Sequence, residues 1–172
     1  EYWNLANCRE SLIGIERVSS MKGKITLEEH FALPEIFTGT TRFSKKGMGS
    51  GLFDEYPKLQ LVIGHLGERI PFDLWRLDHR LKKSPQGIPA KKTMREYMRN
   101  NVHLTTSGQF YDPPLHLTMH EVGVERIMFS VDYPFETTED ACVWFDDAVL
   151  TEPERLAIGR NNAIKLFNLD LK

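Results

Sequence analysis

The sequence predicts an α/β fold in which parallel strands alternate with helices. Residues 24–31, 59–63 and 127–131 are runs of apolar and β-branched side chains, which favour strands. Each run ends at polar groups able to bind a metal or move a proton, namely Glu28 and His30, His65, and Asp132. Barrels of parallel strands present their functional groups at the C-terminal strand ends. Three such endings in one chain therefore predict a functional edge of a parallel sheet.

The elements follow in order along the chain. Residues 24–31 are predicted to form the first strand, which Pro34 ends. Residues 38–51 are rich in Gly, Ser and Thr and are predicted to be an irregular, exposed loop or linker. Further strands are expected at residues 59–63, 102–106 and 127–131. Helices are expected at residues 71–83, 90–99, 113–122, 139–148 and 152–167, the last after Thr151 as N-cap. Alternation of this kind favours parallel pairing with outer helices, about four strands in all.

Within the first of these helices, Phe72, Leu74, Trp75, Leu77 and Leu81 are expected to supply the apolar contacts. Trp75 and Trp144 are interpreted as part of the outer layer of the core. The histidines at 79, 103, 116 and 120 lie on predicted helices or in mid-strand and are interpreted as structural or surface residues.

Composition limits the classes of partner. The 172 residues are 41% hydrophobic, enough to bury one core, and the formal net charge is −2 with no basic block. Nucleic acid and anionic membranes are therefore not expected as partners. Two cysteines, Cys8 and Cys142, argue against a disulfide scaffold and favour a reducing, cytoplasmic location. No apolar run approaches 18 residues.

Two residue pairs carry the candidate chemistry at the first two strand ends. Glu28 and His30 are two apart on a strand and so share one face, which suits two metal ligands. The same spacing also fits an exposed carboxylate beside a hydrogen-bonded histidine. His65 follows a buried strand, and an imidazole can hold and give a proton near neutral pH. Glu68 could orient His65, or be a carboxylate that stabilises a helix N-terminus.

Asp132 closes the strand at 127–131. A carboxylate is a hard donor that suits Zn²⁺ or Mn²⁺, so Asp132 could be a metal ligand. The alternative is that Asp132 is a solvent-exposed residue of a turn. Pro134 and Phe135 are expected to shape a pocket wall beside it. The cysteines and serines have no setting that would make a nucleophile, so covalent catalysis is not expected.

Three strings make the chain resemble a known family. Gly-Lys-Ile-Thr-Leu-Glu-Glu-His-Phe at 23–31, Gly-His-Leu-Gly-Glu at 64–68 and Phe-Ser-Val-Asp-Tyr-Pro-Phe-Glu at 129–136 are similar to the amidohydrolase-related (amidohydrolase 2) family, in its decarboxylase branch. That branch includes 2,3-dihydroxybenzoate and γ-resorcylate decarboxylases. The resemblance implies a TIM-type (β/α) barrel of the metal-dependent hydrolase superfamily. It further implies that Glu28, His30 and Asp132 bind a divalent metal, that His65 acts as acid/base beside it, and that Glu68 supports His65.

The chain departs from that family in length. A complete barrel typically needs about 250 residues, so a partial barrel is expected here. The resemblance covers the first strand and resumes just before the sixth, with the junction at about residues 38–51. The second to fifth strands have no counterpart here, nor has the histidine ligand expected on the fifth strand. Residues 1–20 do not resemble the family and are interpreted as a poorly ordered extension, which leaves residues 21–172 as one incomplete barrel domain.

The resulting hypothesis is a metal-dependent, non-oxidative decarboxylase, a carboxy-lyase that acts on a hydroxylated aromatic acid such as a dihydroxybenzoate. The expected cofactor is Zn²⁺ or Mn²⁺ without an organic cofactor, and the expected partners are the aromatic acid and further copies of the chain. Two alternatives remain open at this point. One is metal-dependent hydrolysis of the amidohydrolase type, and the other is a non-catalytic half-barrel that joins another protomer.

Overall fold

The computed structural model describes residues 48–85 and 87–170. The predicted first strand, the extension at 1–20 and the proposed ligands Glu28 and His30 lie outside the described residues. Most of the predicted loop at 38–51 lies outside them as well.

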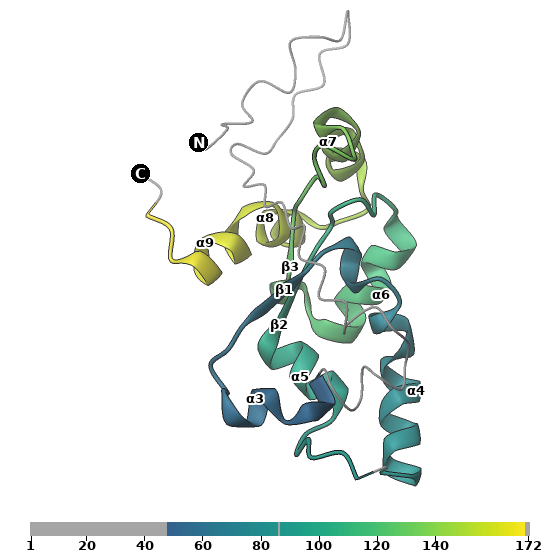
Figure 1. Ribbon diagram of the computed structural model, residues 1–172. Helices are drawn as coiled ribbons and strands as arrows, with labels where there is room; N and C mark the ends of the chain where they lie inside the picture. Colours follow the sequence, from purple (N-terminus) through teal and green to yellow (C-terminus); the bar gives the residue numbers. More distant parts are fainter. Residues whose placement is uncertain (1–47, 86, 171–172) are drawn as a thin grey trace, which may run out of the picture.

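The described chain alternates short strands with helices, as the sequence predicts (Figure 1). Labels follow Figure 1, with η for a 3₁₀ helix except η5, which is a π-helical segment. The elements are η2 (Met48–Ser50), α3 (Leu52–Glu55), β1 (Leu61–Ile63), η3 (His65–Gly67), α4 (Ile70–Lys83), α5 (Met94–Asn101), β2 (Val102–Thr105), α6 (Asp112–Val122), η4 (Val124–Arg126), β3 (Ile127–Met128), α7 (Thr138–Asp147), α8 (Glu152–Leu156), η5 (Ala157–Asn161) and α9 (Asn162–Phe167).

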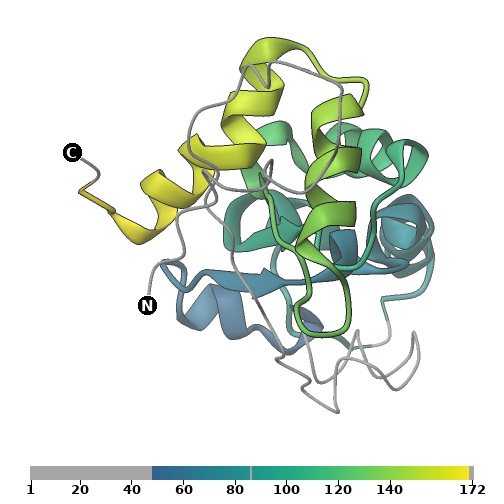
Figure 2. The ribbon, with the colours of Figure 1, turned by 90° about the horizontal axis from the view of Figure 1, so that it is seen from above.

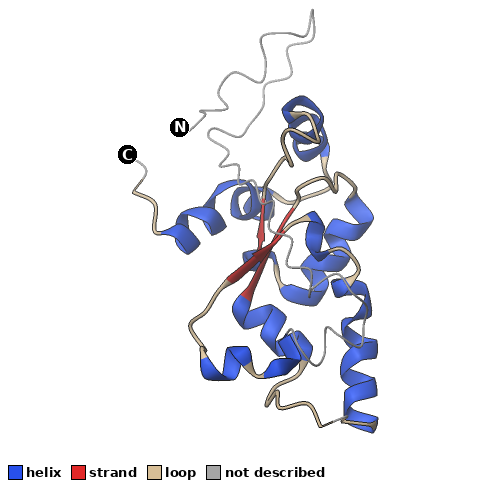
Figure 3. Ribbon diagram, viewed as in Figure 1, coloured by secondary structure: helices blue, strands red, loops and turns tan. Residues whose placement is uncertain are grey.

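The three strands form one parallel sheet in the order β1-β2-β3. Val62 pairs with His103 on one side of β2, and Leu104 pairs with Ile127 on the other. Figure 3 shows the strands at the centre with helices around them. The prediction of parallel pairing among these three strands is confirmed.

The core lies between this sheet and its helices. Helices α4, α5 and α6 contact one another, α5 also contacts β2, and η5 contacts β3. Figure 2 shows α9 and α4 at opposite edges of the molecule. The buried apolar side chains include Phe53, Leu74, Tyr97, Leu104, Leu115, Ile127, Phe129 and Phe145. No helix in the part of the chain that the structure describes is long and apolar enough to cross a membrane.

The third strand is shorter than predicted, because other groups take over its hydrogen bonds. The backbone N–H of Phe129 donates to the carbonyl of Ile158 in η5 at 2.9 Å. The N–H of Ser130 donates to the hydroxyl oxygen of Thr106 at 2.9 Å, and that hydroxyl donates to the Ser130 carbonyl at 2.9 Å. Residues 129–131 are therefore buried but do not form part of the strand.

The helix predicted at 152–167 is interrupted. Thr151 caps α8 through a capping box with Glu154, as expected, but the backbone widens into the π segment η5. The Ile158 carbonyl within that segment accepts the Phe129 bond described above. A π bulge frees a carbonyl from the regular helical ladder, which explains why the interruption lies beside β3.

Helix α4 buries fewer of the predicted side chains than expected. Leu74 is fully buried and Leu77 and Leu81 pack against the core, but Phe72 and Trp75 are 72% and 62% exposed. The prediction that these two aromatic residues contact the core is wrong. At 100° per residue, Phe72 lies about 160–180° from Leu74 and Leu81, and Trp75 lies about 100–120° from them, so both are off the buried stripe. The Trp75 ring instead stacks on His79, with centroids 4.9 Å apart.

The described end of the predicted loop also differs from expectation. Met48 and Gly49 in η2 are buried, and Met48 belongs to the core. The prediction of an exposed, irregular segment is therefore wrong for Met48 and Gly49, whereas Ser50 is exposed as predicted. The Met48 side chain supplies apolar area that the pattern of surrounding glycines does not reveal.

A buried polar cluster lies at the start of the sheet. The guanidinium of Arg126 lies 3.0 Å from the Nε2 of His103 and donates to Gln60 at 3.0 Å. The Nδ1 of His103 is buried and has no hydrogen-bond partner within residues 48–85 and 87–170. Burial, and then the Arg126 charge, lower the pKa of His103 to about 4. The structural role predicted for His103 agrees with this burial.

His103 should make the fold sensitive to mild acid. The unfolded chain takes up a proton near the ordinary pKa of 6.5, whereas the folded chain does so only near 4. The free energy of unfolding should therefore fall as the pH is lowered from about 6.5 to about 4, by at most about 3 kcal/mol from this residue. Urea melts of the native chain and of His103→Gln measure the difference. His79→Gln, on the exposed face of α4, is the control that should retain the pH dependence. If the free energy of unfolding depended equally on pH in the native chain and in His103→Gln, the role given to His103 would be contradicted.

A second prediction concerns the hydroxyl of Tyr97. It donates to Asp54 at 2.6 Å and accepts the N–H groups of Lys91 and Lys92 at 3.0 and 3.1 Å. Burial, followed by the bond to Asp54, raises the pKa of Tyr97 above its ordinary value. Tyr97→Phe should lower the free energy of unfolding by about 1–3 kcal/mol, because these groups lose a buried partner. Tyr111→Phe removes an exposed hydroxyl and should change stability by less than about 0.5 kcal/mol. Equal losses in urea melts of the two variants would refute the role of the Tyr97 hydroxyl.

Candidate active site

The turn after β1 presents His65. Gly64 ends the strand, and two backbone bonds close the turn, from Gly67 N to Gly64 O at 2.8 Å and from Glu68 N to His65 O at 2.9 Å. His65, Leu66 and Glu68 all have positive φ, at 53°, 50° and 54°. Such conformations are uncommon for residues other than glycine and concentrate at functional sites. The buried Leu66 side chain anchors the turn, leaving His65 half-buried and Glu68 exposed.

The chain after β3 presents Asp132. This residue is only 6% exposed and has a φ of 77°. Its carbonyl accepts hydrogen bonds from the N–H groups of Phe135 at 2.8 Å and Glu136 at 3.1 Å, so the following turn holds it. The alternative interpretation of Asp132 as a solvent-exposed turn residue is excluded.

The chain after β2 brings these two side chains together. Gly108 has a φ of 61°, and the position that a Cβ would take there lies 2.9 Å from Asp132 Oδ2 and 3.0 Å from His65 Nδ1. Both side chains therefore lie next to Gly108, at the C-terminal edge of the sheet. The prediction of a cluster of Glu28, His30, His65 and Asp132 at this edge is confirmed for His65 and Asp132, whereas Glu28 and His30 lie outside the described residues.

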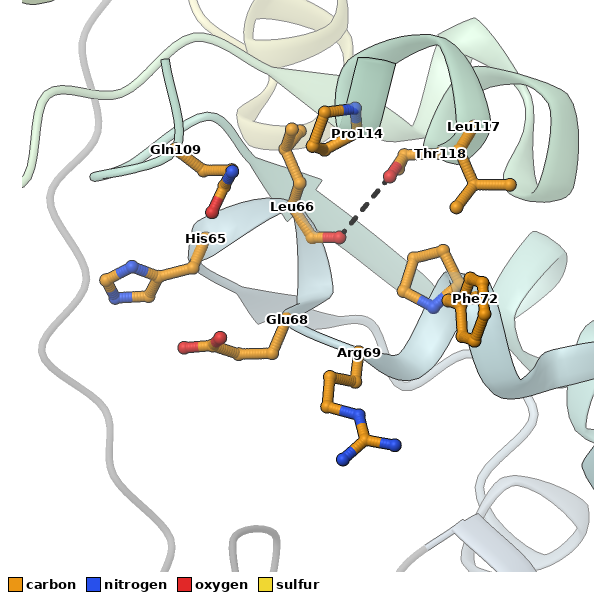
Figure 4. A pocket seen from close by; sticks show the side chains of 10 residues that line it. His65, Leu66, Glu68, Arg69, Phe72, Gln109, Pro114, Leu117 and Thr118 are labelled. Carbon is orange, nitrogen blue, oxygen red and sulfur yellow. Dashed lines mark hydrogen bonds between the residues drawn. The ribbon is translucent and has the colours of Figure 1, made fainter. Parts of the chain in front are cut away.

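A pocket of about 210 Å³ borders this site (Figure 4). Figure 4 shows the side chains of His65 and Glu68 pointing to the same side of the turn. The hydroxyl of Thr118 donates to the Leu66 carbonyl at 3.5 Å across the pocket. The lining residues are His65, Leu66, Glu68, Arg69, Pro71, Phe72, Gln109, Pro114, Leu117 and Thr118. Asp132 is not among them, so the pocket adjoins the pair of His65 and Asp132 and does not enclose it.

Other predicted residues lie elsewhere. Pro134 and Phe135 are exposed and do not line this pocket, which does not include Asp132, so the pocket wall expected beside Asp132 stays a prediction. They follow Asp132 in a turn that points its side chains outward. Cys142 is buried in the core, as expected for a residue with no catalytic setting. The histidines at 79, 116 and 120 are exposed on helices, in agreement with their predicted surface role.

The donors present at this edge suit a divalent metal. Asp132 supplies a carboxylate, and His65 supplies an imidazole beside it, which are ligand types that Mn²⁺ and Zn²⁺ accept. No group of three possible ligands occurs within residues 48–85 and 87–170. A complete coordination sphere at Asp132 would therefore need donors from other parts of the protein, and Glu28 and His30 are the sequence-based candidates.

Sequence reasoning did not single out Gly108 or most of the pocket. Gly108 follows the end of β2, which is where functional side chains were expected, but a glycine has no side chain that could bind a metal or move a proton. Arg69, Phe72 and Gln109 lie next to strand ends or on the first turn of α4. Their closeness to a predicted strand end is the one sequence signal that could have indicated them.

Comparison with known proteins gives the family. Residues 38–169 match the amidohydrolase family model. A γ-resorcylate decarboxylase from Rhodococcus jostii (strain RHA1) is 50% identical over 125 residues, which are 72% of this chain and 38% of that protein. The chain therefore spans less than half the length of the curated relative that it matches.

Solved structures agree with this match. A 2,6-dihydroxybenzoate decarboxylase complexed with 2,6-dihydroxybenzoate has a TM-score of 0.69 and 43% identity, covering 73% of this chain and 40% of that one. A dihydroxybenzoic acid decarboxylase from Polaromonas sp. JS666, with bound manganese and the inhibitor 2-nitroresorcinol, has a TM-score of 0.70 and 41% identity, covering 75% and 40%. The parallel sheet with its helices is thus part of a barrel, and the chain belongs to the amidohydrolase family.

Proposed function

We propose that this chain carries part of the active site of a metal-dependent decarboxylase that acts on a dihydroxybenzoate. The observation that carries the proposal is the convergence of His65 and Asp132 on Gly108, at the C-terminal ends of three parallel strands. The similarity to a γ-resorcylate decarboxylase and to a 2,6-dihydroxybenzoate decarboxylase supports the choice of a hydroxylated aromatic acid.

Asp132 is the proposed metal ligand of the described part, with Glu28 and His30 as its partners. Its carboxylate is buried at the strand end, where a divalent cation would offset the cost of burying the negative charge. Manganese is the ion named for the matched Polaromonas structure, which favours Mn²⁺ here. A bound divalent ion would supply positive charge that orients the carboxylate and an adjacent hydroxyl of the substrate.

His65 is the proposed acid/base. Its imidazole gives a proton to the ring carbon that bears the carboxylate, after which the bond between that carbon and the carboxylate breaks. The electron pair of this bond returns to the ring, and carbon dioxide leaves. 2,6-Dihydroxybenzoate would thus yield resorcinol, with one proton consumed for each carbon dioxide released. The ring itself accepts the electrons, so the reaction requires no organic cofactor.

Glu68 is proposed to support His65. It belongs to the same tight turn, and its exposed carboxylate points to the same side as the imidazole (Figure 4). From there it would orient the imidazole toward the substrate. The positive φ values of both residues fix the direction of these side chains through the backbone.

Replacing Asp132 tests the metal role. Asp132→Ala should weaken Mn²⁺ binding by more than about tenfold and abolish release of carbon dioxide, because an anionic ligand is lost. Isothermal titration with MnCl₂ measures the affinity. Asp147→Ala, at an exposed carboxylate at the end of α7, is the matched control and should leave the affinity unchanged. Unchanged Mn²⁺ binding by Asp132→Ala would refute its role as a ligand.

Replacing His65 separates proton transfer from metal binding. His65→Ala should retain most of the bound manganese, yet lose about 10²–10⁴-fold in carbon dioxide release from 2,6-dihydroxybenzoate. Metal analysis of the purified variant and detection of resorcinol by chromatography provide the two measurements. His79→Ala should behave like the native chain, because that histidine lies on the exposed face of α4. Native turnover by His65→Ala with its metal bound would be inconsistent with the acid/base role.

A further inference from the structure

Gly108 lies where two proposed active-site side chains meet. The three heavy atoms nearest to its missing Cβ are Asp132 Oδ2 at 2.9 Å, His65 Nδ1 at 3.0 Å and His65 Cε1 at 3.2 Å. Real Cβ atoms essentially never approach other heavy atoms below 3.0 Å. An alanine at this position would therefore have to displace the imidazole, the carboxylate or the backbone.

Three backbone positions around this contact are constrained. His65, Gly108 and Asp132 all have φ in the left-handed region, at 53°, 61° and 77°. Each of them follows a strand of the same parallel sheet, so none can move far without disturbing strand pairing or the turn that follows. An added methyl group would be accommodated mainly by the two side chains, because interiors and paired strands resist deformation.

Other described glycines provide a contrast. Gly87 has nearly the same φ, 65°, but nothing lies within 4 Å of its Cβ position. Gly64 has an ordinary φ of −71°, and its Cβ would make normal contacts, the nearest at 3.6 Å from Ser107. At Gly123 the crowding comes from the Glu125 carboxylate, which precedes β3 and so lies at the opposite end of that strand from Asp132. Among the described glycines, Gly108 is the one whose Cβ position is enclosed by His65 and Asp132.

We propose that Gly108 is a positioning residue: its lack of a side chain lets the His65 imidazole and the Asp132 carboxylate approach each other across the end of β2. The chain after β2 thus leaves space at the site, whereas the chain after β1 and β3 supplies the side chains of His65 and Asp132. The consequence for turnover rests on the proposed function, but the geometric claim does not.

Histidine-ring signals in ¹H–¹³C NMR spectra of the full chain test the geometry without metal or substrate. The His65 signals are assigned with His65→Gln. Gly108→Ala should shift the His65 ring signals and leave those of His79, His116 and His120 in place. Gly87→Ala, at a glycine with nearly the same φ but with open space around its Cβ position, should leave the His65 signals unchanged. His65 signals that do not move in Gly108→Ala, or that move equally in Gly87→Ala, would overturn the proposal.

A second NMR comparison asks whether Gly108 controls the approach of the two side chains. Asp132→Asn should shift the His65 ring signals in the native background, because the carboxylate lies beside the imidazole. In the Gly108→Ala background the same substitution should produce a clearly smaller shift. An undiminished effect of Asp132→Asn would mean that the added methyl group does not separate the pair.

Thermal melts keep the proposal testable if Gly108→Ala folds poorly. Gly108→Ala should lower the Tm more than Gly87→Ala, since it adds a steric conflict to the same backbone strain. Removing one side of that conflict should restore part of the loss. The Tm decrease caused by Gly108→Ala should therefore be smaller when it is introduced into His65→Ala than into the native chain. Additive decreases would show that Gly108 and His65 do not interact and would overturn the proposal.

Turnover provides the functional readout. Gly108→Ala should lower kcat for 2,6-dihydroxybenzoate by about 100-fold with little change in KM, as expected when reacting groups are displaced by about 1 Å. Gly87→Ala should retain native kcat and KM. Native kcat in Gly108→Ala would overturn the positioning role. If the native chain itself releases no carbon dioxide, the proposed function fails for this chain, and the NMR and melting results still decide the role of Gly108.

Discussion

Parallel pairing of the buried central strand β2 with both of its neighbours is the interaction on which the rest of the structure depends. All four residues of β2 are buried, and each neighbour is held by a defined register. Because parallel strands end at one edge, this pairing brings together three segments that are far apart in the sequence. His65, Gly108 and Asp132 meet as a direct result. The candidate active site is therefore only as well ordered as the sheet below it.

The sheet is short, and side chains and helices complete its hydrogen bonding. The Thr106 hydroxyl bonds to both the N–H and the carbonyl of Ser130, and η5 accepts the N–H of Phe129. The side-chain amide of Asn162 donates to the carbonyls of Val124 and Ile127 at 2.8 and 2.7 Å. These bonds fix residues 129–131 in an extended, buried path that leads to Asp132. Buried backbone groups that lacked such partners would cost stability, so the bonds hold this path in place.

Much of this arrangement could be predicted from the sequence. Runs of apolar side chains that end in His65 and Asp132 indicated both the strands and the functional edge. A buried strand requires apolar residues, whereas polar residues able to bind a metal or move a proton follow its C-terminal end. Helix faces were predicted less well, since Phe72 and Trp75 are apolar but lie on the solvent side of α4. A count of apolar residues does not reveal which stripe faces the sheet.

The remaining differences arise from contacts between distant segments. The widening at η5 depends on a bond to Phe129, and the burial of Met48 depends on helices that come later in the chain. Gly108 is the clearest case, because its importance lies in the distance between two other side chains. No local pattern encodes that distance. Glu28 and His30, which the sequence suggests as ligands, lie outside the described residues and remain predictions.

The π-helical segment η5 also has a consequence for how this sequence can change in length. A π turn contains about one residue more than the α-helical turn that would replace it. Deleting one residue from 157–161 would let an α-helical turn of about the same rotation replace the π turn, so α9 would keep its face toward the sheet. Asn162 and Ala163 would stay buried beside β3, but the Ile158 carbonyl would return to the helical ladder and leave the N–H of Phe129 without its partner. A single-residue deletion here should therefore loosen the path of residues 129–131 and leave α9 in place.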